Sequence, residues 1–270
     1  MRKHTGLSAV GWTLITLLFA MFTEHCAAQT AGSEANSDKN QSESMNRVAF
    51  HAQDTFMLSA RYYPAQDNTA AALLLHDCDH NSEQYEPLLQ MLANNGVHAL
   101  ALDLRGFGES VSDDFSHEKV KRMSKDVVTY QGEMAKLSVF WPSDLLTSFN
   151  FLRDKVGDQA KIAVVMAGCT ASYGITLAES IRVSSFVMIT PELSYSDKER
   201  YKNLFDIPVL FVSSVHHANT YHTAKELYEW NGDKRSSFQL FKGDRFGHRL
   251  VAHQPFLNHN IAGWLSHVLR

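Results

Sequence analysis

Residues 99–110 read ALALDLRGFGES, an apolar run that ends in a polar turn containing two glycines. From residue 98 to residue 103 apolar and polar side chains do not alternate, which is typical of a strand buried on both faces of a parallel sheet. Residues 82–94 carry apolar side chains at helical spacing and end before Gly96, and residues 71–76 form another apolar run. This stretch therefore predicts a strand–helix–strand unit of an α/β sheet.

The same alternation of elements continues on both sides of this unit. Apolar, β-rich runs predict strands at residues 56–63, 161–166, 185–190, 208–213 and 238–241. Helical spacing recurs at residues 145–152 and 256–265. Alternating strands and helices favour a doubly wound, mostly parallel sheet with helices on both faces. The polar residues 111–140 interrupt the pattern and predict an insertion that forms either a small lid or a surface helix.

The composition fits one large α/β domain and argues against a nucleic-acid-binding protein. The chain has 270 residues, 44% of them hydrophobic and 20% charged, which is enough for one sizeable core. Its formal net charge of −4 leaves no basic surplus to neutralise phosphates. We therefore expect no nucleic-acid partner.

The first 46 residues predict two segments that precede the folded domain, residues 47–270. Residues 1–28 combine a basic start, an apolar run at residues 10–22 and small residues at Cys26-Ala27-Ala28, which is typical of a signal peptide. An uncleaved N-terminal anchor is the alternative, although the run is short for a membrane span. Residues 29–46 are polar and predict a disordered spacer. We therefore expect a secreted or periplasmic protein.

The predicted domain resembles the α/β-hydrolase superfamily, in particular its esterases and dienelactone-hydrolase-like members. The residues that carry the resemblance are the run ALLLH at 72–76 and the segment LDLRGFGES at 102–110. The resemblance implies an eight-stranded, mostly parallel sheet with the site on loops at its carboxyl edge. It also implies a nucleophile after the fifth strand, an acid after the sixth or seventh, and a histidine after the eighth. Neither a cofactor nor a metal ion is expected.

The predicted nucleophile turn departs from the G-x-S-x-G pattern of such enzymes. After the strand at 161–165 the chain reads MAGCTA, from residue 166 to residue 171. Aligned directly from the strand, Gly168 takes the nucleophile's place and the site has no nucleophile. Shifted by one residue, Cys169 takes that place, and a helix N-terminus would favour its thiolate. A structural role for Cys169, with or without a bond to Cys78, is the third interpretation.

The oxyanion loop and the acid position also depart from the pattern. His76, Asp77 and Cys78 follow the strand where the family has His-Gly, so a carboxylate stands where backbone N–H groups should face negative charge. After the strand at 208–213 there is no aspartate, and Asn219 is the side chain that could orient an imidazole. Glu192, after the strand at 185–190, is the other candidate for that role.

The histidine position fits the family, because His248 ends the turn GDRFGH after the last predicted strand. The leading hypothesis is a secreted, catalytically degenerate hydrolase that retains a cleft for a small apolar molecule or for a protein partner. The alternative is an active cysteine hydrolase of esters, thioesters or lactones, with Cys169 as nucleophile and His248 as general base. The sequence does not identify which protein such a partner would be.

A third hypothesis is a histidine-rich metal-binding protein on the same fold. Its main candidate ligands follow two different strands, His76 and His80 after one, and His216 and His217 after another. Further potential ligands on or near these loops are Cys78, Asp79, Cys169, His222 and His248. Because these strands end at the same edge of the predicted sheet, three or four ligands could meet around Zn²⁺ or Cu²⁺. No standard spacing of metal ligands supports this hypothesis.

Overall fold

The computed structural model describes residues 46–67, 69–204 and 206–270. All of them belong to the second of two units of the chain, residues 41–270. The predicted signal peptide at residues 1–28 and all but the last residue of the predicted spacer lie outside the described residues. Within the described part of the chain, no helix is both long enough and apolar enough to cross a membrane.

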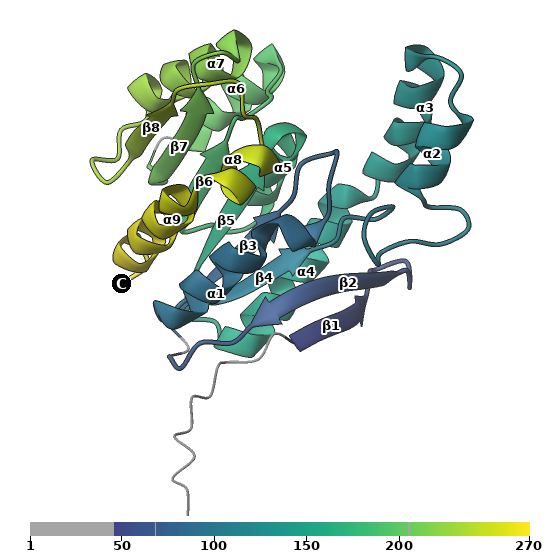
Figure 1. The fold of residues 1–270 in the computed structure, drawn as a ribbon. Coiled ribbons are helices and arrows are strands. Elements are labelled where there is room, and N and C mark those ends of the chain that lie inside the picture. Colours follow the sequence, from purple (N-terminus) through teal and green to yellow (C-terminus); the bar gives the residue numbers. More distant parts are fainter. Residues whose placement is uncertain (1–45, 68, 205) are drawn as a thin grey trace, which may run out of the picture. The chain divides into compact units, whose positions relative to one another are not determined.

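The described residues form the predicted mostly parallel sheet of eight strands, and the strand order is β1-β2-β4-β3-β5-β6-β7-β8. β1 and β2 pair antiparallel to each other, β2 pairs antiparallel to β4, and all other pairs are parallel (Figure 1). The strands are β1 (Asn46–His51), β2 (Met57–Tyr63), β3 (Ala70–Leu75), β4 (His98–Leu102), β5 (Lys161–Ala167), β6 (Ser185–Ile189), β7 (Val209–Ser214) and β8 (Ser237–Phe241).

The register places the carboxyl ends of the central strands side by side. Leu75 at the end of β3 pairs with Leu102 of β4 on one side and with Met166 of β5 on the other. The loops that follow these three strands therefore meet at one edge of the sheet, where ligand sites of open α/β sheets lie.

Helices cover both faces of the sheet, so the strands from β3 to β7 are buried and almost wholly apolar. One core lies between the sheet and α4 (Trp141–Val156), α5 (Ala171–Ser180), α6 (Tyr195–Tyr201) and α7 (Ala218–Trp230). The other lies between the sheet and α1 (Glu86–Asn94), α8 (His248–His253) and α9 (Pro255–Val268). These two layers confirm the predicted doubly wound α/β class.

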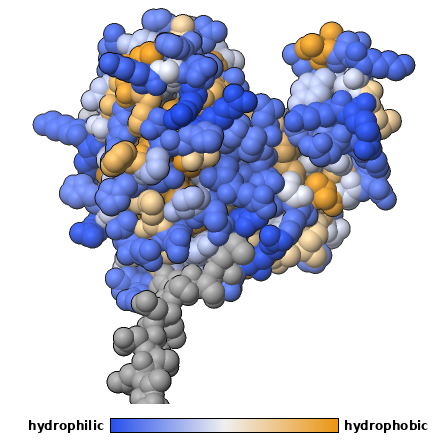
Figure 2. Space-filling view, in the orientation of Figure 1, coloured by the Kyte–Doolittle hydropathy of each residue, from blue (hydrophilic) through white to orange (hydrophobic). Residues whose placement is uncertain are grey.

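The insertion predicted at residues 111–140 contains two helices, α2 (His117–Met123) and α3 (Val127–Ser138). Each has a side-chain N-cap, Ser116 for α2 and Asp126 for α3. Three apolar side chains around the turn between them are more than two-thirds exposed: Met123, Val127 and Val128. Figure 2 shows hydrophobic atoms on this part of the surface.

Candidate functional site

The turn from β5 into α5 takes its shape from Gly168. This residue has φ +55°, in the left-handed region that favours glycine, and begins a short 3-10 turn, Gly168–Thr170. A side chain at residue 168 would meet the ring of Phe246 at 3.2 Å and Cβ of Asp77 at 3.4 Å. Gly168 therefore occupies the position directly after the strand, where the nucleophile of the family pattern would stand, and Cys169 lies one residue further on.

Cys169 forms a disulfide with Cys78, 91 residues away in the sequence. Their Cα atoms are 6.1 Å apart, within the normal range for such a bond. The bridge joins the loop after β3 to the turn after β5. The cysteine-hydrolase alternative requires a free Cys169 thiol, and in this structure that thiol is bonded.

Asp77 and His248 form the central interaction of the site. Both the backbone N–H and Nδ1 of His248 lie 2.8 Å from Oδ2 of Asp77. The two side chains are largely buried, with 5% of Asp77 and 17% of His248 exposed. Gly247, with φ +46°, permits the approach, because a Cβ at this position would overlap Oδ2 of Asp77. The carboxylate from the predicted oxyanion loop therefore orients the imidazole.

This arrangement corrects the expectation that Asn219 or Glu192 orients His248. Asn219 is exposed in the first turn of α7, and the Nδ1 atom that it would have to bind is occupied by Asp77. Glu192 places its backbone N–H on the carbonyl of Gly168, at 3.1 Å. Partial burial and the negative charges of Asp77 and Asp79 raise the pKa of the Glu192 carboxyl.

The end of β6 supports the loop that carries His248. Thr190 has φ +45°, which is unusual for a β-branched residue. Its buried hydroxyl accepts a hydrogen bond from the backbone N–H of Gly247, at 3.0 Å. Such strain persists only where surrounding contacts hold it, and it is common at functional sites.

His80 completes a cluster of three potential metal ligands. Its ring stacks on that of His248, with ring centroids 3.4 Å apart and planes at 17°. One ligand atom from each of Asp77, His80 and His248 lies within 4.8 Å of the other two. His80 is exposed, but partial loss of solvent around its ring is the main cause that lowers its pKa, and the neighbouring His248 lowers it further.

The ligand set predicted from the sequence is not the one that the structure assembles. His76 has both ring nitrogens engaged, Nδ1 with the carbonyl of Asp77 at 2.7 Å and Nε2 with the N–H of Leu104 at 3.1 Å. Nε2 of His217 lies 2.6 Å from the carbonyl of Asp244. Among the described residues, the group of potential ligands contains His80 but not His76, His216 or His217. Of these four histidines only His80 thus joins the cluster, together with His248, which the sequence places near the same loops.

A cavity of about 370 Å³ lies beside the cluster, between the loops that follow β3 and β4. Three carboxylates line it, those of Asp79, Glu83 and Glu118, together with His80. None of its described lining residues is a lysine or an arginine. A larger cavity of about 630 Å³ lies at the opposite edge of the sheet, near the starts of β5, β6 and β7, and has no part in this site.

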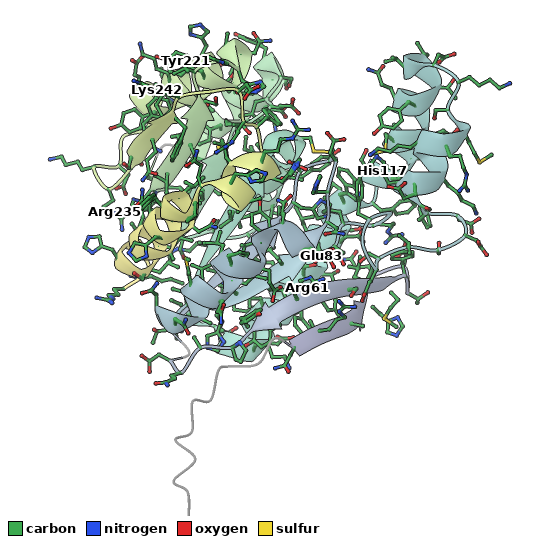
Figure 3. All side chains as sticks on the ribbon, in the orientation of Figure 1. Arg61, Glu83, His117, Tyr221, Arg235 and Lys242 are labelled. Atoms are coloured by element: carbon green, nitrogen blue, oxygen red, sulfur yellow. A yellow bond between two sulfur atoms is a disulfide. The ribbon has the colours of Figure 1, made fainter. Side chains whose placement is uncertain are left out.

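His117 forms one wall of this cavity and is labelled in Figure 3 at the start of the α2–α3 insertion. Its ring stacks on Phe107, with ring centroids 4.3 Å apart, and its Nε2 atom lies 2.9 Å from the hydroxyl of Tyr130. Burial lowers the pKa of His117 to about 4. The histidine is therefore neutral in the folded protein near pH 7.

Lowering the pH from 7.5 to 4.5 is expected to reduce the free energy of unfolding by about 2 to 3 kcal/mol through His117 alone. The unfolded chain protonates this residue near pH 6.5, whereas the folded protein does so only near pH 4. The contribution of neutral His117 to stability is thus fully present above the pKa that this residue has in the unfolded chain, and it is lost as the pH falls. Urea unfolding of the wild type and His117→Phe at both pH values measures the difference.

The comparison uses the change with pH within each protein, so a pH-independent cost of His117→Phe cancels. The matched control is His259→Phe, at an exposed histidine of α9, which should keep the pH dependence of the wild type. Equal pH dependence in His117→Phe and the wild type would contradict the prediction.

Comparisons with known proteins show the fold. No protein-family model matches the chain, and no curated protein matches it by sequence. An esterase from Pyrococcus furiosus has a TM-score of 0.59 and 14% sequence identity, over 85% of this chain and 92% of that one. A dienelactone hydrolase from Anabaena variabilis has a TM-score of 0.62 and 14% identity, over 84% and 99%. DcsB, solved with a substrate analogue, has a TM-score of 0.65 and 13% identity, over 84% and 99%. The chain has the α/β-hydrolase fold.

Proposed function

We propose that this chain, which has the α/β-hydrolase fold, is a catalytically degenerate member that binds a small molecule at the carboxyl edge of its sheet. The observation that carries the proposal is Gly168 at the left-handed position of the turn after β5. Acyl transfer in hydrolases of this fold begins with attack by a side chain at this turn. Glycine has no atom that could attack.

The neighbourhood of Gly168 also opposes such a reaction. The Asp77 carboxylate lies beside the turn and is directed to His248. A negative charge about 4 Å from a developing oxyanion costs about 4 kcal/mol at an effective dielectric constant of 20, which is roughly a thousandfold in rate. The contacts of Asp77 with His248 therefore support a histidine that is packed and held in one orientation. This histidine has no nucleophile to deprotonate.

We also propose that the protein is exported. The basic, apolar and small residues at positions 1–28 support a signal peptide. The Cys78–Cys169 disulfide supports an oxidising compartment, because such bonds are rare in reducing cytosol. The same bond disfavours the cysteine-hydrolase alternative in that compartment.

The proposed function predicts no enzymatic hydrolysis of p-nitrophenyl butyrate by the purified full chain in EDTA. The rate should equal that of His248→Ala and that of the control His259→Ala, because only surface imidazoles remain to react. Release of p-nitrophenol measures the rate, and ligand-observed NMR with the same ester measures binding in the cleft. EDTA removes any contribution from a bound metal ion.

Two results would overturn the proposal. One is saturable turnover that His248→Ala abolishes and His259→Ala retains, which would establish an enzyme that uses His248. The other is absence of ester binding at millimolar concentration together with absence of turnover, which would remove small acyl compounds as occupants of the cleft.

A further inference from the structure

We propose that Asp77, His80 and His248 bind a divalent transition-metal ion, with Zn²⁺ as the best match, at the carboxyl edge of the sheet. The three side chains come from the loop after β3 and from the start of α8, 171 residues apart for Asp77 and His248. One ligand atom of each lies within 4.8 Å of the others. This inference rests on the proposed function, because it assigns an occupant to the binding edge of a site without a nucleophile.

The separation of the ligand atoms suits a first-row metal ion. In tetrahedral coordination, bonds of about 2.0 to 2.2 Å from zinc to nitrogen and oxygen place the ligand atoms about 3.3 to 3.6 Å from one another. The widest separation in the cluster must therefore shrink by up to about 1.5 Å, which requires a ligand side chain to move. Two imidazoles and one carboxylate with an open position are also the donor set of several zinc and iron enzymes.

Asp77 is held in place by two backbone N–H groups, as metal ligands commonly are held by hydrogen bonds. Its Oδ2 accepts the backbone N–H of His248 at 2.8 Å, and its Oδ1 accepts the backbone N–H of Asp79 at 3.3 Å. The neighbouring disulfide of Cys78 ties the same loop to the turn after β5. The carboxylate is thus positioned before any ion binds.

His80 is the ligand that must move. Two rings that stack with planes at 17° cannot both direct a nitrogen lone pair at one ion. His80 is exposed, so its ring can turn out of the stack toward the ion without disturbing the core. His248 keeps its place, and to bind the ion through Nδ1, which lies 2.8 Å from Oδ2 of Asp77, its imidazole must carry its single proton on Nε2.

The electrostatics of the adjoining cavity favour a cation. Asp79, Glu83 and Glu118 line it, and no described lining residue is a lysine or an arginine. Glu83 is labelled in Figure 3, and its carboxylate pairs with Arg61. An ion in the cluster would keep an open coordination position toward this cavity, where a ligand oxygen could bind.

The test is a zinc titration of the full chain, purified without a histidine tag and stripped with EDTA. Isothermal titration calorimetry with Zn²⁺ alone should give one ion per chain. His80→Ala should raise the dissociation constant at least about tenfold, and His248→Ala should do the same. Titration with Co²⁺ provides a second readout, because its visible absorption depends on the donor atoms and should change in His80→Ala.

The controls separate this site from other histidines. His259→Ala, at an exposed residue of α9, should bind zinc like the wild type. No stoichiometric binding, or unchanged binding in His80→Ala and His248→Ala, would overturn the inference, as would loss of binding only in His216→Ala or His217→Ala. His80 is exposed, so His80→Ala tests the site without risk to the core. The ester assay in EDTA contains no metal ion, so failure of the proposed function and failure of this site are distinguishable.

Discussion

Replacing both Cys78 and Cys169 with serine is expected to lower the free energy of unfolding by about 4 kcal/mol. The disulfide closes a loop of 91 residues, and the stabilisation that a cross-link provides by restricting the unfolded chain grows with loop length. Both cysteines lie in loops at the edge of the sheet rather than within its strands, so serine can replace them without opening the core. Urea unfolding of the double variant and the wild type measures the difference.

The reducing agent dithiothreitol provides the matched control. It should lower the stability of the wild type to that of the double variant, and it should leave the double variant unchanged. A difference below about 1 kcal/mol would contradict the expected stabilisation, and an equal response of both proteins to the reducing agent would show that the two cysteines are not bonded in solution.

The expected loss also bears on the site. The bridge begins one residue after Asp77 and ends one residue after Gly168. These are the two positions at which this chain departs most from hydrolases that use an acyl-enzyme. A covalent bond between them restricts the relative movement of the loops that carry Asp77 and the turn. The disulfide is therefore suited to holding these two loops in one arrangement for binding. It also leaves Cys169 without a free thiol that could react.

The central strands could be predicted from the sequence because their burial leaves an unmistakable pattern. The runs at 71–76, 98–103 and 161–166 differ from the observed β3, β4 and β5 by one residue at either end at most. β1 was not predicted. It lies at the edge of the sheet, and its side chains are exposed or half-buried, so it has no apolar run.

The insertion at residues 111–140 shows the limit of a polar pattern. The sequence predicts either a lid or a surface helix, and the structure has a pair of helices, α2 and α3. Their helical signals are local caps, at Ser116 and Asp126, rather than an apolar stripe. Composition alone could not locate the break between them.

The orienter of His248 could not be found by position in the family pattern. The sequence directs attention to Glu192 and Asn219, after β6 and β7, whereas the contact is made by Asp77, after β3. A hydrogen bond between residues so far apart depends on the register of the whole sheet. One signal was present: the oxyanion loop gains a carboxylate in the same chain that lacks one after β7.

Replacing Arg105 with methionine is expected to lower the free energy of unfolding by about 3 to 5 kcal/mol. Arg105 belongs to the LDLRGFGES segment and is 1% exposed. Its Nε and Nη2 atoms donate to the two carboxylate oxygens of Asp144, at 3.0 and 2.7 Å. Asp144 is fully buried, and burial raises the pKa of its carboxyl while Arg105 lowers it. Without the arginine, a buried carboxylate loses its partner.

Other contacts of Arg105 add to the expected loss. Its guanidinium lies 4.3 Å from the ring centroids of both Phe56 and Phe140, close enough for cation–π attraction. The hydrogen bond from the indole of Trp141 to the backbone carbonyl of Arg105, at 3.1 Å, does not depend on the arginine side chain and should persist in the variant. Methionine fills part of the volume but replaces neither the charge nor the planar contact.

A double variant separates the cost of the unpaired charge from the cost of lost packing. Adding Asp144→Leu to Arg105→Met removes the unpaired carboxylate and should recover part of the stability, so the two substitutions should not be additive. The matched control is Arg235→Met, which breaks an exposed ion pair with Asp233 and should cost less than about 1 kcal/mol. If Arg105→Met costs no more than Arg235→Met in urea unfolding, the buried pair does not hold this part of the fold. If the double variant loses the sum of both single effects, the unpaired carboxylate is not the cause.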